Sequence, residues 1–378
     1  MIKKRLLTPG PVSIYPPGLQ AALDSNVHHR SPEFKAVLSE TIHSLKKILG
    51  EPDQVFLLSS SGSGGMETAV TNFFSPGDEV LVASCGKFGE RWIELSKTYQ
   101  LNGKILQYEY GEPVRPEDIE KNLKENPRIE GVFLQACESS TGVQNDIDSI
   151  AAIVQKSNAI LIVDAISALA TMPLSCSTGV DVLVSGSQKA LMVPPGLAFV
   201  GVTRKAWARV EGCKTQRYYF DLRRAKKAWD DGGMTSFTPA TSLVLSLRES
   251  LKAIETWGLD RLIQLTENRA RATRAGLETM GLKIFAKRPA NALTAVKAPG
   301  NDCDKIRSQL KQRFGFQVAG GQGDMKNMVF RISHMGYIDH FDALGVLGGL
   351  ELVLKSLGYP VSLGASLVAF QKIYDEIA

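Results

Sequence analysis

Three polar groups follow apolar segments at points where chemistry could take place. Lys189 ends the segment DVLVSGSQK, Asp164 ends AILIVD, and a glycine- and serine-rich stretch, SGSGG at 61–65, follows QVFLLSS. A lysine whose pKa is lowered by burial is a nucleophilic amine that can capture an aldehyde. A carboxylate at the end of a buried strand needs a partner to stay ionised. A glycine-rich stretch that opens a helix presents backbone amides to an anion.

Each feature also has an ordinary structural explanation. Lys189 could extend to solvent, Asp164 could cap the next segment, and SGSGG could be a connector. The stretch is not a Walker loop, since no Gly-Lys-Ser/Thr follows, and Glu67 replaces the last glycine of a dinucleotide-binding GxGxxG motif. Together, however, an anion-binding loop, an acid and an amine match the phosphate, the pyridine nitrogen and the aldehyde of pyridoxal phosphate.

Other polar and aromatic residues leave two interpretations open. Phe88, in CGKFGER, could stack on a cofactor ring or belong to the core. Ser139, in ESSTG, could bind a ring hydroxyl or shape a turn. His28 and His29 could line a substrate entrance, but a structural role in a loop is favoured. The cysteines are isolated and no histidine has further ligands nearby, so no metal site is expected.

Short apolar strands that alternate with amphipathic helices must position these residues. Expected strands are 54–60, 78–84, 103–110, 130–136, 158–165, 181–187 and 197–203, and expected helices are 63–74, 88–100, 116–126 and 146–157. The alternation predicts a doubly wound α/β domain, whose ligands bind beyond the carboxyl ends of the strands.

The second half of the chain has a different pattern. Two long helices, 241–258 and 259–281, lead into strands at 282–287, 292–299, 316–321 and 328–336 and helices at 303–314 and 340–358. This order predicts a smaller α+β unit. We therefore expect an N-terminal segment at 1–20, a large α/β domain at 21–258 and a small C-terminal α+β domain at 259–378.

Several motifs together resemble the class V (subgroup IV) pyridoxal-phosphate aminotransferases of the alanine-glyoxylate and serine-glyoxylate or serine-pyruvate type. The resemblance extends from LTPGPV through CGKFGER, ESSTGV, VDAISAL and SGSQKAL to FRISHMGYIDHFDAL, nearly the whole chain. It implies the fold-type-I architecture, a large, mostly parallel sheet domain with a smaller C-terminal domain. The C-terminal half is most similar to the branch labelled soluble hydrogenase 42 kDa subunit. Because no cysteines cluster into a Ni-Fe or Fe-S ligand set, we expect transamination instead.

The resemblance implies a role for each matching residue. Lys189 would hold pyridoxal phosphate as an internal aldimine and carry the substrate proton, while Asp164 would pair with the pyridinium nitrogen. Arg331 would bind the substrate carboxylate. The ring would lie between Phe88 and Ile166. The remaining contacts would be made to the ring hydroxyl by Ser139 and to the phosphate by Ser63, Gly64, Gly65, Gln188 and, from a neighbouring subunit, Thr238.

The reaction implied is a ping-pong transfer of an amino group from a small amino acid, alanine or serine, to glyoxylate or pyruvate, carried out by a homodimer. Two positions depart from relatives. Gly65 replaces a larger residue, which favours a backbone contact there, and Ser236 replaces a tyrosine of animal relatives, so no phosphate contact is expected from it.

Composition and motifs limit which partners, locations and alternative functions the sequence favours. Lys and Arg total 44 against 39 Asp and Glu, which does not favour nucleic acid, and the absence of a long apolar run or a signal-like start favours a cytoplasmic, non-membrane protein. A cysteine desulfurase or related lyase would need a cysteine in 319–327, where none occurs. A dinucleotide-binding dehydrogenase leaves Lys189 unexplained, and a non-enzymatic scaffold leaves all three polar strand ends without a purpose.

Overall fold

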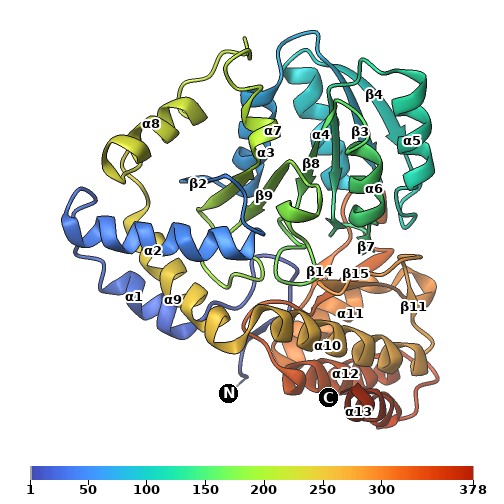
Figure 1. The fold of residues 1–378 in the computed structure, drawn as a ribbon. Helices are drawn as coiled ribbons and strands as arrows, with labels where there is room; N and C mark the ends of the chain where they lie inside the picture. Colours follow the sequence, from blue (N-terminus) through green and yellow to red (C-terminus); the bar gives the residue numbers. More distant parts are fainter. Residues whose placement is uncertain (1, 378) are drawn as a thin grey trace.

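A seven-stranded sheet dominates the computed structural model, which describes residues 2–377 (Figure 1). All strands run in the same direction except β10, which is antiparallel to both of its neighbours. This mostly parallel sheet confirms the predicted α/β fold. In spatial order the strands are β2 (Gln54–Leu58), β10 (Ala198–Val202), β9 (Val182–Gly186), β8 (Ile160–Asp164), β5 (Gly131–Gln135), β3 (Glu79–Ser84) and β4 (Asn102–Gln107).

Helices cover both faces of the sheet, as the alternation of strands and helices predicts. One face packs against α3 (Gly62–Phe73) and α4 (Lys87–Thr98), with Trp92 fully buried against Phe133. The other face packs against α2 (Pro32–Ile48), α5 (Pro116–Glu125) and α6 (Ile147–Val154). Two separate apolar cores therefore hold the strands rigidly, and the strand ends are fixed points for a site.

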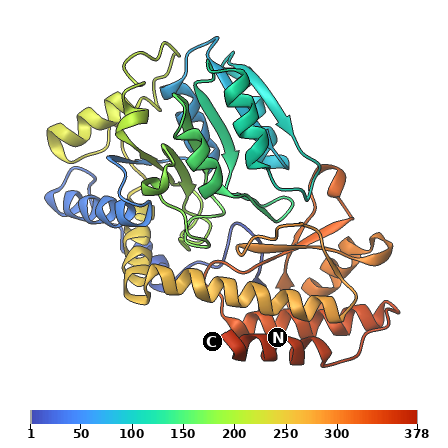
Figure 2. The same ribbon diagram turned by 45° about the vertical axis from the view of Figure 1, so that its right-hand side comes forward.

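Four helices connect the large sheet to the C-terminal part of the chain. They are α7 (Arg204–Trp207), α8 (Leu222–Gly232), α9 (Thr241–Trp257) and α10 (Leu259–Thr279). Gly258 separates α9 from α10 with a φ of 84°, a left-handed conformation that glycine adopts without strain. The chain therefore turns sharply there, and α10 runs beneath the large sheet (Figure 2).

A four-stranded sheet packs with α10 and three further helices to form the C-terminal unit, which has a core of its own. In the order of the sheet its strands are β11 (Lys283–Ile284), β12 (Leu293–Lys297), β15 (Val329–Ser333) and β14 (Ala319–Gly320), and its helices are α11 (Cys303–Gln309), α12 (His340–Ser356) and α13 (Ala365–Ile377). The N-terminal strand β1 (Arg5–Leu6) pairs with β13 (Phe316–Gln317) of this unit. The chain between β1 and α1 (Pro16–Leu23) then reaches the large domain, where the amide of Val12 donates to the carbonyl of Gln188 at 3.2 Å.

The structure differs from the expected elements at several places. The strand expected at 316–321 is two strands, because β13 pairs with β1 whereas β14 pairs with β15. The helix expected at 303–314 ends as α11 and continues as a π-helical turn, Leu310–Phe314. Helices α1, α2, α7, α8 and α13 were not predicted, and a small hairpin joins β6 (Cys137–Glu138) to β7 (Val143–Gln144).

Helix α2 nevertheless carries a start signal in the sequence. The hydroxyl of Ser31 accepts a hydrogen bond from the amide of Phe34 at 3.1 Å, and Pro32 occupies the first helical position. Within residues 2–377, no helix combines the length and apolar character that a membrane span requires.

Candidate active site

The carboxyl ends of five strands meet around one cavity of about 240 Å³. Strands β2, β3, β5, β8 and β9 run in the same direction, so the segments that follow them converge at one edge of the sheet. Seven of the predicted site residues line this cavity. They are Ser63, Phe88, Ser139, Asp164, Ile166, Gln188 and Lys189.

Gly64 and Gly65, also predicted to hold a phosphate, do not line the cavity. Their amides donate hydrogen bonds to the carbonyl of Ser61, at 2.9 and 3.4 Å, within the first turn of α3. A Cβ atom on Gly65 would lie 2.8 Å from Cγ1 of Val184 on β9. This glycine therefore lets α3 approach the sheet closely, and the glycine-rich stretch brings Ser63 to the cavity wall.

Lys189 lies in the wall of the cavity, where the N-terminal segment holds its amine. Its Nζ donates a hydrogen bond to the carbonyl of Pro9 at 2.5 Å. Gly10 has a φ of 135°, and a Cβ atom there would lie 2.4 Å from Nζ of Lys189. Desolvation lowers the pKa of Lys189 to about 8, against a smaller opposing effect of the Asp164 charge. At pH 7 roughly one amine in ten is therefore neutral and nucleophilic, a far larger fraction than for an ordinary lysine.

Asp164, the last residue of β8, is buried, with 4% of its surface exposed. One carboxylate oxygen accepts a hydrogen bond from the amide of Ile166 at 2.8 Å. Burial nevertheless raises the pKa of Asp164 to about 7, while the Lys189 charge acts in the opposite direction. The carboxylate is thus poised to bind a protonated nitrogen, which would favour its ionised form.

Arg331 reaches the site from β15 of the C-terminal unit. Its guanidinium is buried and donates to the carbonyl of Ser139 at 2.7 Å and twice to the carbonyl of Gly320, at 2.8 and 3.0 Å. Burial lowers the pKa of Arg331 to about 10, and the charge of Glu138 opposes this effect. Arg331 is not among the cavity-lining residues, but it contacts Ser139, which is. A buried guanidinium with only carbonyl partners is suited to receive a carboxylate.

Glu138 was missed by the sequence reasoning although it organises this edge. Its carboxylate accepts hydrogen bonds from the amides of Phe88 and Gly89, at 3.0 and 2.9 Å, and from the amide and hydroxyl of Ser140, at 3.0 and 2.6 Å. Burial raises the pKa of Glu138 above its usual value, although these hydrogen bonds oppose the shift. Glu138 therefore fixes the start of α4, and with it Phe88. A glutamate three residues after the strand GVFLQ was the available signal.

Comparison with known proteins identifies the family. The sequence profile of the family described as Aminotransferase class-V matches residues 14–336. The chain is a class V aminotransferase. It is 37% identical over 380 residues to the soluble hydrogenase 42 kDa subunit of Anabaena cylindrica, covering 99% of both chains. It is 34% identical to the L-aspartate–glyoxylate aminotransferase of Paracoccus denitrificans, covering 98% of this chain and 96% of the relative.

Solved structures agree with this assignment. Ureidoglycine-glyoxylate aminotransferase from Bacillus subtilis superposes with a TM-score of 0.94, at 26% identity, over 99% of both chains. The resemblance to class V aminotransferases and the predicted enzyme class are thereby confirmed.

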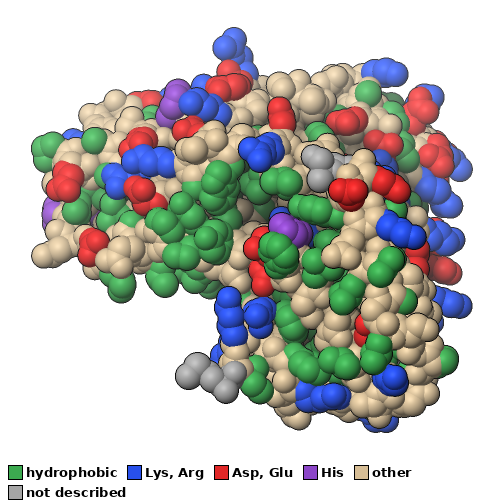
Figure 3. Space-filling model, turned by 90° about the horizontal axis from the view of Figure 1, so that it is seen from below, with side chains coloured by type: hydrophobic (Ala, Val, Ile, Leu, Met, Phe, Trp, Pro, Cys, Tyr) green, Lys and Arg blue, Asp and Glu red, His purple; other side chains and the backbone are tan. Residues whose placement is uncertain are grey.

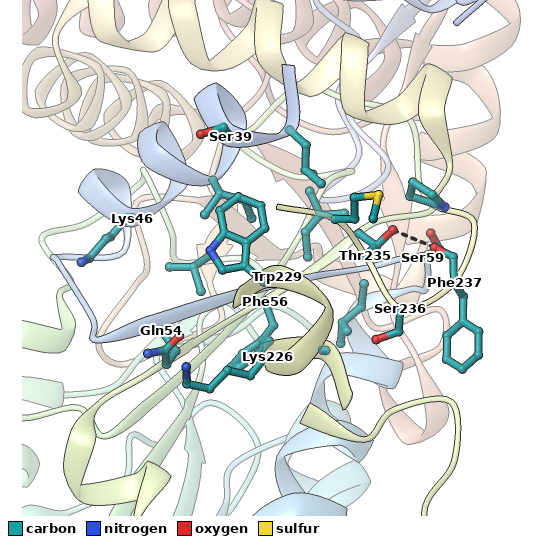
Figure 4. A pocket seen from close by; sticks show the side chains of 18 of the residues that line it. Ser39, Lys46, Gln54, Phe56, Ser59, Lys226, Trp229, Thr235, Ser236 and Phe237 are labelled. Atoms are coloured by element: carbon teal, nitrogen blue, oxygen red, sulfur yellow. Dashed lines mark hydrogen bonds between the residues drawn. The ribbon is translucent and has the colours of Figure 1, made fainter. Parts of the chain in front are cut away.

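Thr238 of this class V aminotransferase lines a different cavity, of about 350 Å³, formed by α2, β2, α8 and the segment after α8. Figure 4 shows Trp229 and Phe56 in its wall, with Thr235, whose hydroxyl donates to the carbonyl of Phe237 at 2.7 Å. The structure therefore does not bring Thr238 to the Lys189 cavity of its own chain, which leaves its expected role to a neighbouring subunit.

The loop after β9 holds Lys189 in place through Ser187. The Ser187 hydroxyl donates to the carbonyl of Pro194 at 2.7 Å and accepts from the amide of Leu197 at 3.2 Å.

His28 and His29 lie between α1 and α2 and are not among the residues that line the Lys189 cavity. Within residues 2–377, no group of three or more His, Cys, Asp or Glu side chains is arranged to hold a metal ion.

Proposed function

We propose that this class V aminotransferase binds pyridoxal phosphate on Lys189 and transfers an amino group from alanine or serine to glyoxylate or pyruvate. The observation that carries the proposal is the placement of a buried amine and a buried carboxylate in one cavity, beside the start of α3. In this arrangement Lys189 would bind the aldehyde, and Asp164 the pyridine nitrogen.

The residues of the cavity fit this cofactor. The side-chain oxygen of Gln188 is buried and has no hydrogen-bond partner, so the Gln188 amide group is free to turn toward a ligand. The first amides of α3, at Gly62 and Ser63, have no partner within the helix because of their position. Both features suit a phosphate at the start of α3. Phe88 and Ile166 supply apolar surface for the ring.

Bound pyridoxal phosphate would act as an electron sink for the bond broken at the α-carbon of the amino acid. The chain's own contribution is proton transfer and orientation. Nζ of Lys189 is the base that removes the α-proton and later returns a proton, and its lowered pKa of about 8 makes the neutral amine more available than in an ordinary lysine. Asp164 keeps a positive charge at the ring nitrogen, and Arg331 orients the substrate by its carboxylate.

The names of the compared aminotransferases both include glyoxylate as acceptor, which supports glyoxylate here as well. One of those names also contains aspartate, so aspartate is the first donor to compare with alanine and serine.

Absorbance and borohydride trapping test the cofactor proposal. The protein incubated with pyridoxal phosphate should become yellow, and borohydride should abolish this absorbance and attach the cofactor to Lys189. Lys189→Ala should remain colourless, whereas Lys156→Ala, at an exposed position, should behave as the wild type. A wild-type protein that takes up no pyridoxal phosphate would refute the proposal. A screen of alanine, serine and aspartate against glyoxylate and pyruvate then identifies the substrates.

A homodimer with Thr238 at the neighbouring site is part of the same proposal. Large apolar side chains are exposed on α1 and before α8, with Leu23 at 74% and Tyr218 at 66%. Figure 3 shows apolar side chains gathered over the part of the molecule where Figure 1 places α1. Burial of this surface between two copies would remove apolar area from water. Sedimentation should give a dimer, and Thr238→Ala should weaken cofactor binding.

We also propose the division of the chain into 1–20, 21–258 and 259–378, since Gly258 separates α9 from α10. A cytoplasmic location is supported by the cysteines, all five of which are buried and unpaired.

A desulfurase reaction is the main alternative to the proposed transamination. It is not favoured, because the loop before Arg331 has no cysteine and Cys303 is fully buried at the start of α11. Release of sulfide from cysteine would favour it.

A further inference from the structure

Arg91 is a charged residue of the Lys189 cavity to which the proposed function assigns no task. Three charged side chains line the cavity: Arg91, Asp164 and Lys189. In the proposed function, Lys189 binds the aldehyde and Asp164 binds the ring nitrogen. Arg91 is therefore the remaining charged group in the wall.

The contacts of Arg91 link the two parts of the cavity that would hold the phosphate and the ring. Nη1 donates a hydrogen bond to the hydroxyl of Ser63, in the first turn of α3, at 3.0 Å. The guanidinium also lies 5.0 Å from the centre of the Phe88 ring, over its face. Arg91 is one helical turn after Phe88 on α4, which brings the guanidinium over that ring. Its side chain thus couples Ser63 to Phe88.

The positive charge of Arg91 has no acidic contact in the part of the chain that the structure describes. Its contacts there are with a hydroxyl and an aromatic ring, neither of which neutralises a guanidinium. Its charge is felt in the cavity, where it lowers the pKa of Asp164. An unneutralised guanidinium beside the start of a helix favours an anion.

We propose that Arg91 is a further phosphate-site residue, which fixes the hydroxyl of Ser63 and supplies positive charge to the phosphate of pyridoxal phosphate. The proposal rests on the proposed function. A phosphate monoester carries close to two negative charges at neutral pH. The N-terminus of α3 offers the equivalent of only about half a positive charge. Because Lys189 is committed to the aldehyde, the Arg91 guanidinium is the charge available to complete the site.

The test compares two aldehydes that differ only in the phosphate. Dissociation constants of pyridoxal phosphate and of pyridoxal are measured by absorbance for the wild type, Arg91→Met and Arg91→Lys. We expect Arg91→Met to weaken pyridoxal phosphate binding by about 10- to 100-fold, the loss typical of a charged hydrogen-bonding group. Pyridoxal binding should change less than about threefold. Arg91→Lys, which keeps the charge, should recover part of the loss. Inorganic phosphate should compete with pyridoxal phosphate more strongly in the wild type than in Arg91→Met.

Arg204→Met is the matched control, since its side chain is 91% exposed on α7. It should bind both aldehydes as the wild type does. Equal weakening of both aldehydes in Arg91→Met would overturn the phosphate role, because it would indicate general distortion of the cavity. An unchanged dissociation constant for pyridoxal phosphate would also overturn it. If Arg91→Met does not fold, Arg91→Gln provides the same comparison. A wild type that binds neither aldehyde would instead refute the proposed function.

Discussion

Replacement of Asp164 by asparagine should stabilise the ligand-free protein at alkaline pH, although the substitution lies in the active site. The structure gives the reason. Asp164 is buried with one hydrogen bond, from the amide of Ile166, and its pKa is raised from 3.8 to about 7. Asparagine has nearly the same shape, keeps an oxygen that can accept that hydrogen bond, and carries no charge to desolvate.

The sign and size of the effect follow from proton linkage. Because the folded-state pKa of Asp164 is raised, the folded protein binds the proton more tightly than the unfolded chain. The resulting stability is fully present below about pH 4 and is lost as pH rises through about 7. Each tenfold difference in proton affinity between the folded and the unfolded state corresponds to about 1.4 kcal/mol. Between pH 5 and pH 8 the wild type should therefore lose up to about 3 kcal/mol relative to Asp164→Asn.

Urea unfolding of the ligand-free proteins at several pH values measures this difference. The free energy of unfolding of Asp164→Asn minus that of the wild type should grow from pH 5 to pH 8. Asp260→Asn, at an exposed position in the first turn of α10, is the control and should show no such growth. A difference that stays constant with pH, or that shrinks toward pH 8, would refute the assignment of a buried, costly carboxylate to position 164.

Three further substitutions test the geometry of the site. Gly10→Ala should reduce borohydride-trapped cofactor on Lys189, because its Cβ would lie 2.4 Å from Nζ and its φ of 135° is unfavourable for alanine; full labelling would contradict this. Gly65→Val should lower the free energy of unfolding by about 1–3 kcal/mol in urea, since its side chain would collide with Val184, and an unchanged midpoint would argue against close packing there. Arg331→Lys should raise the KM for the amino acid by about tenfold or more with a smaller change in kcat, because lysine lacks the planar fork; an unchanged KM in steady-state assays would count against a carboxylate-binding role.

Much of the site was predictable because it lies at strand ends. The segments DVLVSGSQK and AILIVD are continuous apolar runs, so the positions of Lys189 and Asp164 beyond β9 and β8 follow from local patterning. Parallel strands bring such ends to one edge, and seven predicted residues do line one cavity. The resemblance to class V aminotransferases supplied the expected roles, which sequence patterning alone left open.

The sequence by itself determined the α/β alternation, the order of the chemical groups along the chain and the family. Only the tertiary structure decided which groups from distant segments meet. Pro9 accepts the hydrogen bond of Lys189, Glu138 fixes Phe88, and Arg91 contacts Ser63. These contacts are long-range, and a local pattern does not specify them. Local sequence likewise does not specify the pKa values of Lys189 and Asp164, because desolvation depends on every atom packed around a group and not on its neighbours in sequence.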